Sequence, residues 1–430
     1  MASEIFLRAT HWLSPARLCR VWRLETTGRR MPGLLAARHL CWIALILLSA
    51  CAGRPEGGAL VVNDVAAPGA KEHEIFVATT RSRDDTDANA MFSGERRDLE
   101  PGVSELDFAH VGVSVPPNHV AGNVEWPKSL PGDPSKNFVT RSKGYVNDEK
   151  EFAAEIRKAV ASRPKGQRNV LVFVHGFNTK FDEGVYRLAQ MVNDTGFEGV
   201  PVLFTWASRG RIFDYVYDRD SATVARDALE DTLEIAAASG AEEVTLFAHS
   251  MGNWVAVEAL RQAKIAGHER FGGKLKGVVL ASPDIDVDVF KAEMRRYGKP
   301  NPPFLMLISQ DDKALRVSSL LAGDKPRVGG YASDDQEIAD LGVVIVDLTN
   351  LKGGDNLGHS KFALIGGDFA AAMMKRMRAG DNLDFASDPT FSEQASQLGR
   401  GLGNTVGGAA GIIITTPVAI LTAPLEIFSR

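Results

Sequence analysis

A serine at position 250 has the sequence setting of a catalytic nucleophile. It is the centre of Ala248-His249-Ser250-Met251-Gly252, between an apolar run that predicts a strand (residues 244–248) and an amphipathic segment that predicts a helix (residues 253–265). A serine on such a tight strand-to-helix turn projects its hydroxyl above the sheet, at helix N–H groups that favour negative charge. The usual pattern is G-x-S-x-G, and Ala248 is small enough to replace the first glycine. The alternative is a turn serine that caps the helix.

A second turn, Val174-His175-Gly176-Phe177-Asn178, ends another apolar run and is suited to hold an oxyanion. The backbone N–H of Phe177 and that of Met251 are the expected donors, each worth about 3–4 kcal/mol to the transition state. Phe177 would act through its backbone. We interpret His175 as a structural histidine, because its place in the chain order does not suit the base.

The general base is expected after the last strand, where Leu357-Gly358-His359-Ser360 provides His359. Its position before a helix predicted at residues 361–378, and the chain order Ser…Asp…His, favour this role.

The acid that orients the base has candidates in two clusters, Asp284 with Asp286 and Asp311 with Asp312, each following a predicted strand. We choose Asp312, because the second cluster is the usual location and Asp312 lies two residues ahead of the helix predicted to start at Ala314. Asp311, Asp284 and Asp286 remain alternatives, since an aspartate in either cluster can instead cap the next helix.

The elements that must position these residues form an alternating pattern. Apolar runs without polar alternation fit parallel strands buried on both faces. Their alternation with helices predicts a mostly parallel, doubly wound α/β sheet with functional groups at the carboxyl ends of its strands. Strands are expected at residues 170–174, 202–206, 244–248, 277–281, 304–309 and 343–346, with helices at 183–193, 221–238, 253–265, 287–296 and 314–321. Residues 74–80 and 108–115 predict an N-terminal β extension, followed by a helix at 148–162.

Composition argues against several function classes. The formal net charge is −5, and the seven Arg and two Glu of the first 50 residues leave −10 on the remainder, which disfavours nucleic-acid binding. Cys19, Cys41 and Cys51 are the three cysteines, so the chain beyond residue 51 has no disulfide or cysteine nucleophile. None of the nine histidines shows metal-ligand spacing, and we expect neither a metal nor another cofactor.

The N-terminus predicts export. Arginines precede an uncharged apolar run at residues 40–50, which is too short to span a membrane, and Met31 is an alternative start to Met1. Leu48-Ser49-Ala50-Cys51 resembles the lipobox of bacterial lipoproteins, which implies a diacylglycerol on Cys51 and a periplasmic, membrane-anchored protein. Ala52 permits sorting to the outer membrane. The alternatives are a plain signal peptide or a chance match.

Together these segments resemble the DUF900 family of bacterial α/β-hydrolases, often labelled esterase/lipase-superfamily enzymes. The resembling segments are residues 76–81, 113–117, 174–178, 205–210, 217–220, 248–252, 282–286, 309–315 and 358–360. Trp206-Ala207-Ser208 departs from the family's usual Trp-Pro-Ser. The resemblance implies the α/β-hydrolase fold and a triad of Ser250, Asp312 and His359, and implies little about the substrate.

Candidate substrate contacts lie near the expected mouth of the site. They are Asn178, Trp206, Arg209 and Tyr217. The alternative for residues 206–220 is a loop packed by Tyr217 and held by ion pairs of its aspartates.

We expect four parts in the chain: a signal segment (1–50), a flexible tether (51–72), the hydrolase domain (73–380) and a Gly-rich apolar tail (381–430). Gly399, Gly403, Gly407 and Gly411 recur every four residues in the tail, a spacing that allows close helix packing in membranes, although Pro417 interrupts any helix. The alternatives for the tail are membrane association or a strand-and-loop extension packed on the core.

The sequence thus predicts a serine hydrolase, of carboxylesterase or lipase type, that cleaves small-molecule or lipid esters at the bacterial cell envelope. An acyltransferase with the same triad and a catalytically silent scaffold are the alternatives. The acyl group and the oligomeric state stay open.

If Cys51 carries lipid, the chain expressed in bacteria should incorporate labelled palmitate, and Cys51→Ser should abolish the incorporation. Equal incorporation in both proteins would contradict the lipoprotein interpretation.

Overall fold

The structure, a computed structural model, describes residues 57–98, 104–331, 335–351, 355, 357–364 and 413–415. All of them belong to one unit of the chain, residues 52–430. The expected signal segment, Cys51 and the tail other than residues 413–415 lie outside the described residues. In the described part, no helix combines the length and apolarity needed to cross a bilayer.

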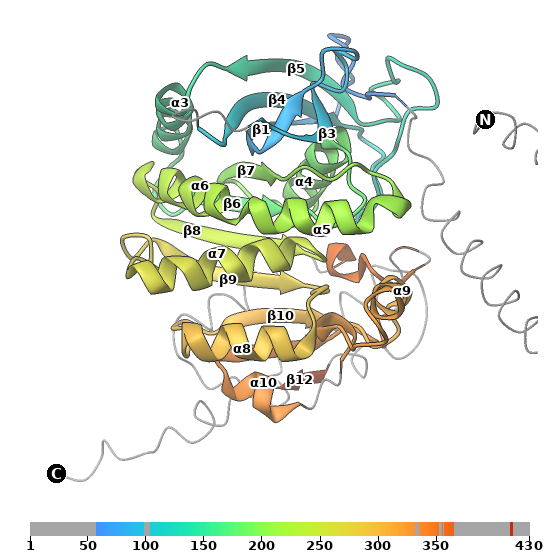
Figure 1. The fold of residues 1–430 in the computed structure, drawn as a ribbon. Helices are drawn as coiled ribbons and strands as arrows, with labels where there is room; N and C mark the ends of the chain where they lie inside the picture. The colour runs from blue at the N-terminus through green and yellow to red at the C-terminus, as the bar shows by residue number, and fades with distance from the viewer. Residues whose placement is uncertain are drawn as a thin grey trace, which may run out of the picture. The chain divides into compact units, whose positions relative to one another are not determined.

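A ten-stranded sheet has the order β12-β11-β10-β9-β8-β6-β7-β1-β4-β5 (Figure 1). The strands from β11 to β1 run parallel, and β4, β5 and β12 join antiparallel at the edges. This confirms the predicted doubly wound, mostly parallel sheet with an N-terminal β extension. The strands are β1 Lys71–Thr79, β4 Asp107–Val115, β5 Val139–Val146, β6 Asn169–Val174, β7 Val200–Thr205, β8 Glu243–His249, β9 Leu275–Ala281, β10 Phe304–Ile308, β11 Val343–Asp347 and β12 Ile413–Thr415.

Helices cover both faces of this sheet. Buried side chains of α3, α6, α7, α8 and α10 pack on one face and those of α4 on the other. The helices are α3 Glu149–Ala161, α4 Phe181–Thr195, α5 Tyr215–Val224, α6 Arg226–Ala238, α7 Gly252–Ala266, α8 Val287–Tyr297, α9 Lys313–Leu321 and α10 Gln336–Asp340, with 3-10 turns η2 Ile212–Asp214, η3 Val328–Gly330 and η4 Lys361–Leu364.

One helix prediction was wrong. Residues 221–238 belong to two helices, α5 and α6, separated at Ala225, whose ψ of 0° leaves the helical range. The apolar periodicity continues across this one-residue break, so it does not reveal the break. The helix predicted at residues 361–378 is the short turn η4 as far as the structure describes it.

The N-terminal extension is part of the sheet interior. β1 pairs parallel with β7 and antiparallel with β4, while β2 (Arg81–Arg83) and β3 (Phe92–Arg96) form a separate two-stranded sheet. The sequence did not reveal β2, β3 or β5, because their polar residues resemble loop composition. The flexible tether predicted for residues 51–72 is also wrong where the structure describes it: Leu60 is fully buried, and the N–H of Ala59 donates to Asp182 at 2.9 Å.

The turns after β6 and β8 approach each other so closely that glycine is required in both. A Cβ on Gly252 would lie 2.4 Å from the carbonyl oxygen of His175, and a Cβ on Gly176 would lie 2.7 Å from Cβ of Ser250. Neither distance is compatible with a side chain. The two strand ends therefore touch through backbone atoms, and this contact brings the turns that carry Phe177 and Ser250 together.

We predict that Gly252→Ala lowers the free energy of unfolding by about 1–3 kcal/mol, because the added methyl group meets backbone that cannot move aside cheaply. Gly184→Ala in α4 is the matched control: its Cβ would meet Leu203 at an ordinary 3.4 Å, and the helix should gain up to about 1 kcal/mol. Urea unfolding measures both. Equal stability of the two variants would contradict the close approach.

Candidate active site

Ser250 stands on a strained turn between β8 and α7. Its φ of 54° lies in the left-handed region, which is uncommon for a residue with a side chain, and it is only 5% exposed. Such strain persists only where surrounding bonds hold it. Here the N–H of Ser250 donates to Ala281 at 2.9 Å, and its carbonyl accepts from the N–H of Asp284 at 3.2 Å. The turn is thus fixed to the end of β9.

Asn253 also holds the serine turn through side-chain hydrogen bonds, a role that was not predicted from the sequence. Its fully buried amide donates to the carbonyls of Ser250 and Ala281, both at 2.9 Å. A polar residue on the first, inward-facing turn of a buried helix is the signal that could have revealed it.

The two expected oxyanion donors flank this turn. Among the described residues, no hydrogen-bond acceptor is recorded for the N–H of Phe177 or of Met251. Met251 directly precedes α7, so its N–H belongs to the electropositive end of that helix. Both groups are therefore available to an incoming oxygen atom.

His175 is buried beside the Phe177 turn. Its Nδ1 lies 2.9 Å from the carbonyl of Gly176, and its Nε2 lies 2.7 Å from the hydroxyl of Thr205. Burial, reinforced by the charge of Arg81, lowers the pKa of His175 to about 3, so the ring is neutral. Trp206 stacks on this ring with centroids 5.0 Å apart and donates its indole N–H to the carbonyl of His175 at 3.0 Å.

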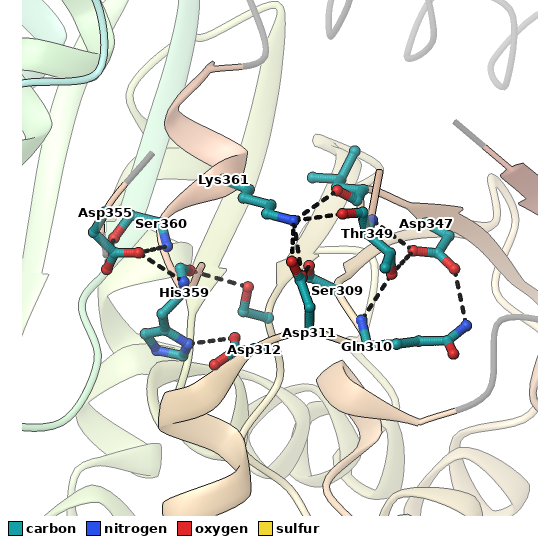
Figure 2. A network of polar contacts seen from close by, with 12 residues as sticks. Ser309, Gln310, Asp311, Asp312, Asp347, Thr349, Asp355, His359, Ser360 and Lys361 are labelled. Carbon is teal, nitrogen blue, oxygen red and sulfur yellow. Dashed lines mark hydrogen bonds and ion pairs between the residues drawn. The ribbon is translucent and has the colours of Figure 1, made fainter. Parts of the chain in front are cut away.

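His359 lies against Asp312, as Figure 2 shows. Nδ1 of His359 is 2.6 Å from Oδ2 of Asp312, whose side chain is fully buried. The other carboxylate oxygen of Asp312 accepts the N–H of Leu315 at 3.0 Å and caps α9. Asp312 therefore both contacts the histidine and caps a helix.

The loop that carries His359 is fixed at several points (Figure 2). Asp355 accepts the N–H of His359 at 2.8 Å. The carbonyl of His359 accepts from the hydroxyl of Ser282 at 3.2 Å and contacts Nε2 of His249 at 3.4 Å. Since His249 precedes Ser250, and its ring lies 4.7 Å from that of His359 between centroids, His359 is held beside the serine turn. In the described residues no hydrogen bond joins the Ser250 hydroxyl to the His359 ring, a contact that often forms only with substrate bound.

The remaining aspartates are engaged elsewhere. Asp311 receives Nζ of Lys361 at 2.8 Å and the hydroxyl of Ser309 at 2.5 Å. Asp284 is buried with Arg327 at 3.2 Å and the hydroxyl of Ser318 at 2.5 Å. Asp286 caps α8 by accepting the N–H groups of Asp288 and Val289. Of the four candidates, Asp312 is the aspartate that the structure brings to His359.

The charge of Asp312 controls the His359 ring. Burial alone disfavours the protonated ring, but the charge of Asp312 and its hydrogen bond more than offset this and raise the pKa of His359 to about 9. Asp312 therefore stabilises the protonated imidazole, the state that a base reaches after it takes a proton.

The candidate substrate contacts fall into two groups. Trp206 is fully buried and packs on His175, so its side chain does not face a substrate. Arg209 makes two bonds to Glu95, both at 2.8 Å, and lies 3.6 Å over the ring of Tyr217. Arg209 and Tyr217 are thus packed as the loop alternative predicted, while both stay partly exposed. Asn178 adjoins Phe177 with a φ of 57° and is partly buried.

One group of metal-ligand type occurs within the described residues, at a distance from these turns. Ligand atoms of Glu230, Glu234 and His268 lie within 4.8 Å of one another. Both nitrogens of His268 already contact these carboxylates, each at 2.8 Å. His268 follows the far end of α7, about 20 Å along that helix from Ser250. We assign this group no part in the site.

Comparison with solved structures finds distant likenesses, which include two structures of esterase from Pyrobaculum calidifontis. A monoclinic form of its esterase is 14% identical with a TM-score of 0.28, covering 54% of this chain and 94% of that one. A structure described as a hyperthermophilic esterase from this archaeon is 12% identical with a TM-score of 0.27, covering 85% and 98%. No curated protein matches the chain.

The family comparison is more extensive. Residues 148–366, just over half of the chain, match the family described as an alpha/beta hydrolase of unknown function, DUF900. The match spans the serine turn, the Phe177 turn, Asp312 and His359, and confirms the resemblance drawn from the motifs. The chain belongs to the DUF900 family of α/β-hydrolases.

Proposed function

We propose that this α/β-hydrolase is a serine esterase whose triad is Ser250, His359 and Asp312. The observation that carries the proposal is the 2.6 Å contact between His359 and the buried Asp312, beside a serine held in a left-handed turn. A histidine oriented by a carboxylate can take the proton of a serine hydroxyl, and the serine turn presents that hydroxyl at a helix N-terminus.

The proposed reaction has two steps. Ser250 Oγ bonds to the acyl carbon while His359 takes its proton, and the N–H groups of Phe177 and Met251 bind the oxyanion. His359 then gives the proton to the leaving alcohol as the ester bond breaks. In the second step water attacks the acyl carbon while His359 takes its proton. The bond from the acyl carbon to Ser250 Oγ then breaks, and His359 returns the proton to Oγ.

Two alternatives use the same fold. An acyltransferase would replace water by an acceptor alcohol, and a scaffold would have no turnover at all. We also propose that the protein acts at the cell envelope on small-molecule or lipid esters, a proposal that depends on the lipobox-like Leu48-Ser49-Ala50-Cys51. The palmitate labelling described above tests the anchor separately from the chemistry.

A fluorophosphonate probe tests the nucleophile. We expect it to label the folded wild-type protein on Ser250 and to leave Ser250→Ala unlabelled, because the probe needs an activated serine. Absence of labelling on a wild-type protein that unfolds cooperatively would contradict the proposal. Product analysis with and without added alcohols then separates the hydrolase from the transferase.

The pH dependence tests the base. A base works only when deprotonated, so kcat/KM should rise with pH through the pKa of His359, and the value of about 9 places that rise above pH 7. Asp312→Asn should shift the rise to lower pH, because without the carboxylate charge the burial of His359 lowers its pKa. The same variant should lower kcat by about 10⁴-fold. Rates on p-nitrophenyl butyrate, corrected for spontaneous hydrolysis, measure both effects.

Asp311→Asn is the matched control for this experiment. Asp311 is bonded to Lys361, and not to His359, so this neighbouring substitution should leave the midpoint of the profile where it is. A midpoint that stays fixed in Asp312→Asn, or moves equally in both variants, would show that Asp312 does not set the state of the base.

A further inference from the structure

Arg81 is a buried arginine that ends the family-like segment at residues 76–81 but lies outside the region matched by the family comparison. It is only 1% exposed and is the first residue of β2, whereas the matched region begins at residue 148. A buried charge costs free energy unless its donors find partners. Its position two residues after the end of β1 places it beside the carboxyl end of β7.

The five N–H donors of its guanidinium have five acceptors. Nε donates to the hydroxyl of Thr205 at 2.8 Å. The other contacts are Nη1 to the carbonyls of Ser93 and Ser208 at 3.0 and 2.7 Å, and Nη2 to the carbonyl of Thr179 at 2.8 Å and to Nε2 of His175 at 3.4 Å. Burial lowers the pKa of Arg81 to about 10, so the group is charged at neutral pH.

These acceptors surround the Phe177 turn. Because the hydroxyl of Thr205 accepts from Arg81, its own proton is free to donate to Nε2 of His175, 2.7 Å away. Nε2 is then an acceptor, and the ring proton sits on Nδ1, which donates to the carbonyl of Gly176 at 2.9 Å. Arg81 and Thr205 on one side of the ring and the Gly176 carbonyl on the other thus favour the same tautomer of the histidine that holds the turn.

The turn is fixed from its other side as well. The N–H of Asn178 donates to Asp218 at 3.3 Å, and the N–H of Thr179 donates to the hydroxyl of Ser208 at 3.0 Å. The hydroxyl of Ser208 in turn donates to Asp218 at 2.5 Å, while its carbonyl accepts from Arg81. The N–H groups of Asn178 and Thr179 are therefore occupied, whereas no described residue accepts a hydrogen bond from the N–H of Phe177.

We propose that Arg81 is a positioning residue for the oxyanion hole: its guanidinium holds the 175–179 turn in the one arrangement that aims the Phe177 N–H at the acyl oxygen. This inference rests on the proposed esterase function. Lysine cannot replace Arg81, because a single ammonium group cannot reach all the acceptors that surround the planar guanidinium.

The test compares Arg81→Met and Arg81→Lys with Arg83→Met, using p-nitrophenyl butyrate and a trifluoromethyl ketone inhibitor. Arg83 is the matched control: it lies two residues further along β2, pairs with Asp107 at 2.7 Å and is 44% exposed. Both Arg81 variants should lose about 10²-fold in kcat, the effect of one lost oxyanion donor, with KM nearly unchanged. The inhibition constant of the ketone should rise by a similar factor, since its tetrahedral adduct carries the oxyanion.

Thr205→Val provides a second variant if Arg81 variants fail to fold. It removes the hydroxyl that links Arg81 to His175 while keeping the side-chain shape, and it should lower kcat and leave KM nearly unchanged. Full kcat and unchanged ketone affinity in a folded Arg81→Lys or Thr205→Val protein would overturn the inference. If Ser250→Ala instead kept the turnover of the wild-type protein, the esterase proposal itself would be overturned.

Discussion

Two strand ends meet in this protein without room for a β-carbon between them. Gly252 lies against the carbonyl of His175, and Gly176 lies against Ser250. This contact determines the rest of the site, because it places the Phe177 turn and the start of α7 on either side of the serine. Any side chain at these positions would separate the two N–H groups that an oxyanion must reach together. The strained φ of Ser250 is held by its backbone hydrogen bonds to Ala281 and Asp284 after β9.

The proposed triad depends on a carboxylate that contacts two groups. One oxygen of Asp312 caps α9, which fixes the carboxylate, and the other meets His359. Helix capping and orientation of the base, which the sequence presents as alternatives, are here compatible, because the two oxygens point to different partners. The neighbouring Asp311 turns the other way and pairs with Lys361, so it makes no bond to the His359 ring.

The sequence predicts much of this arrangement for a physical reason. Strands buried on both faces leave continuous apolar runs, and the order of turns along those runs locates Ser250, Phe177 and His359. It does not predict the break at Ala225, because one non-helical residue leaves the periodicity intact. It also does not predict a role for Arg81, since four of the five acceptors of that guanidinium lie more than 90 residues away along the chain and meet it only in the folded protein. The available signals were a charged residue directly after a predicted strand and its place at the end of the family-like segment 76–81.

The proposed mechanism requires that Ser250 becomes acylated with the help of His359. Rapid quenching of the protein with p-nitrophenyl butyrate, followed by mass spectrometry of the peptide that carries residue 250, tests this most directly. We expect a burst of p-nitrophenol equal to the amount of protein, a butyryl group on Ser250, and loss of both in His359→Ala. Turnover without an acyl group on Ser250, or with the acyl group on another residue, would contradict it.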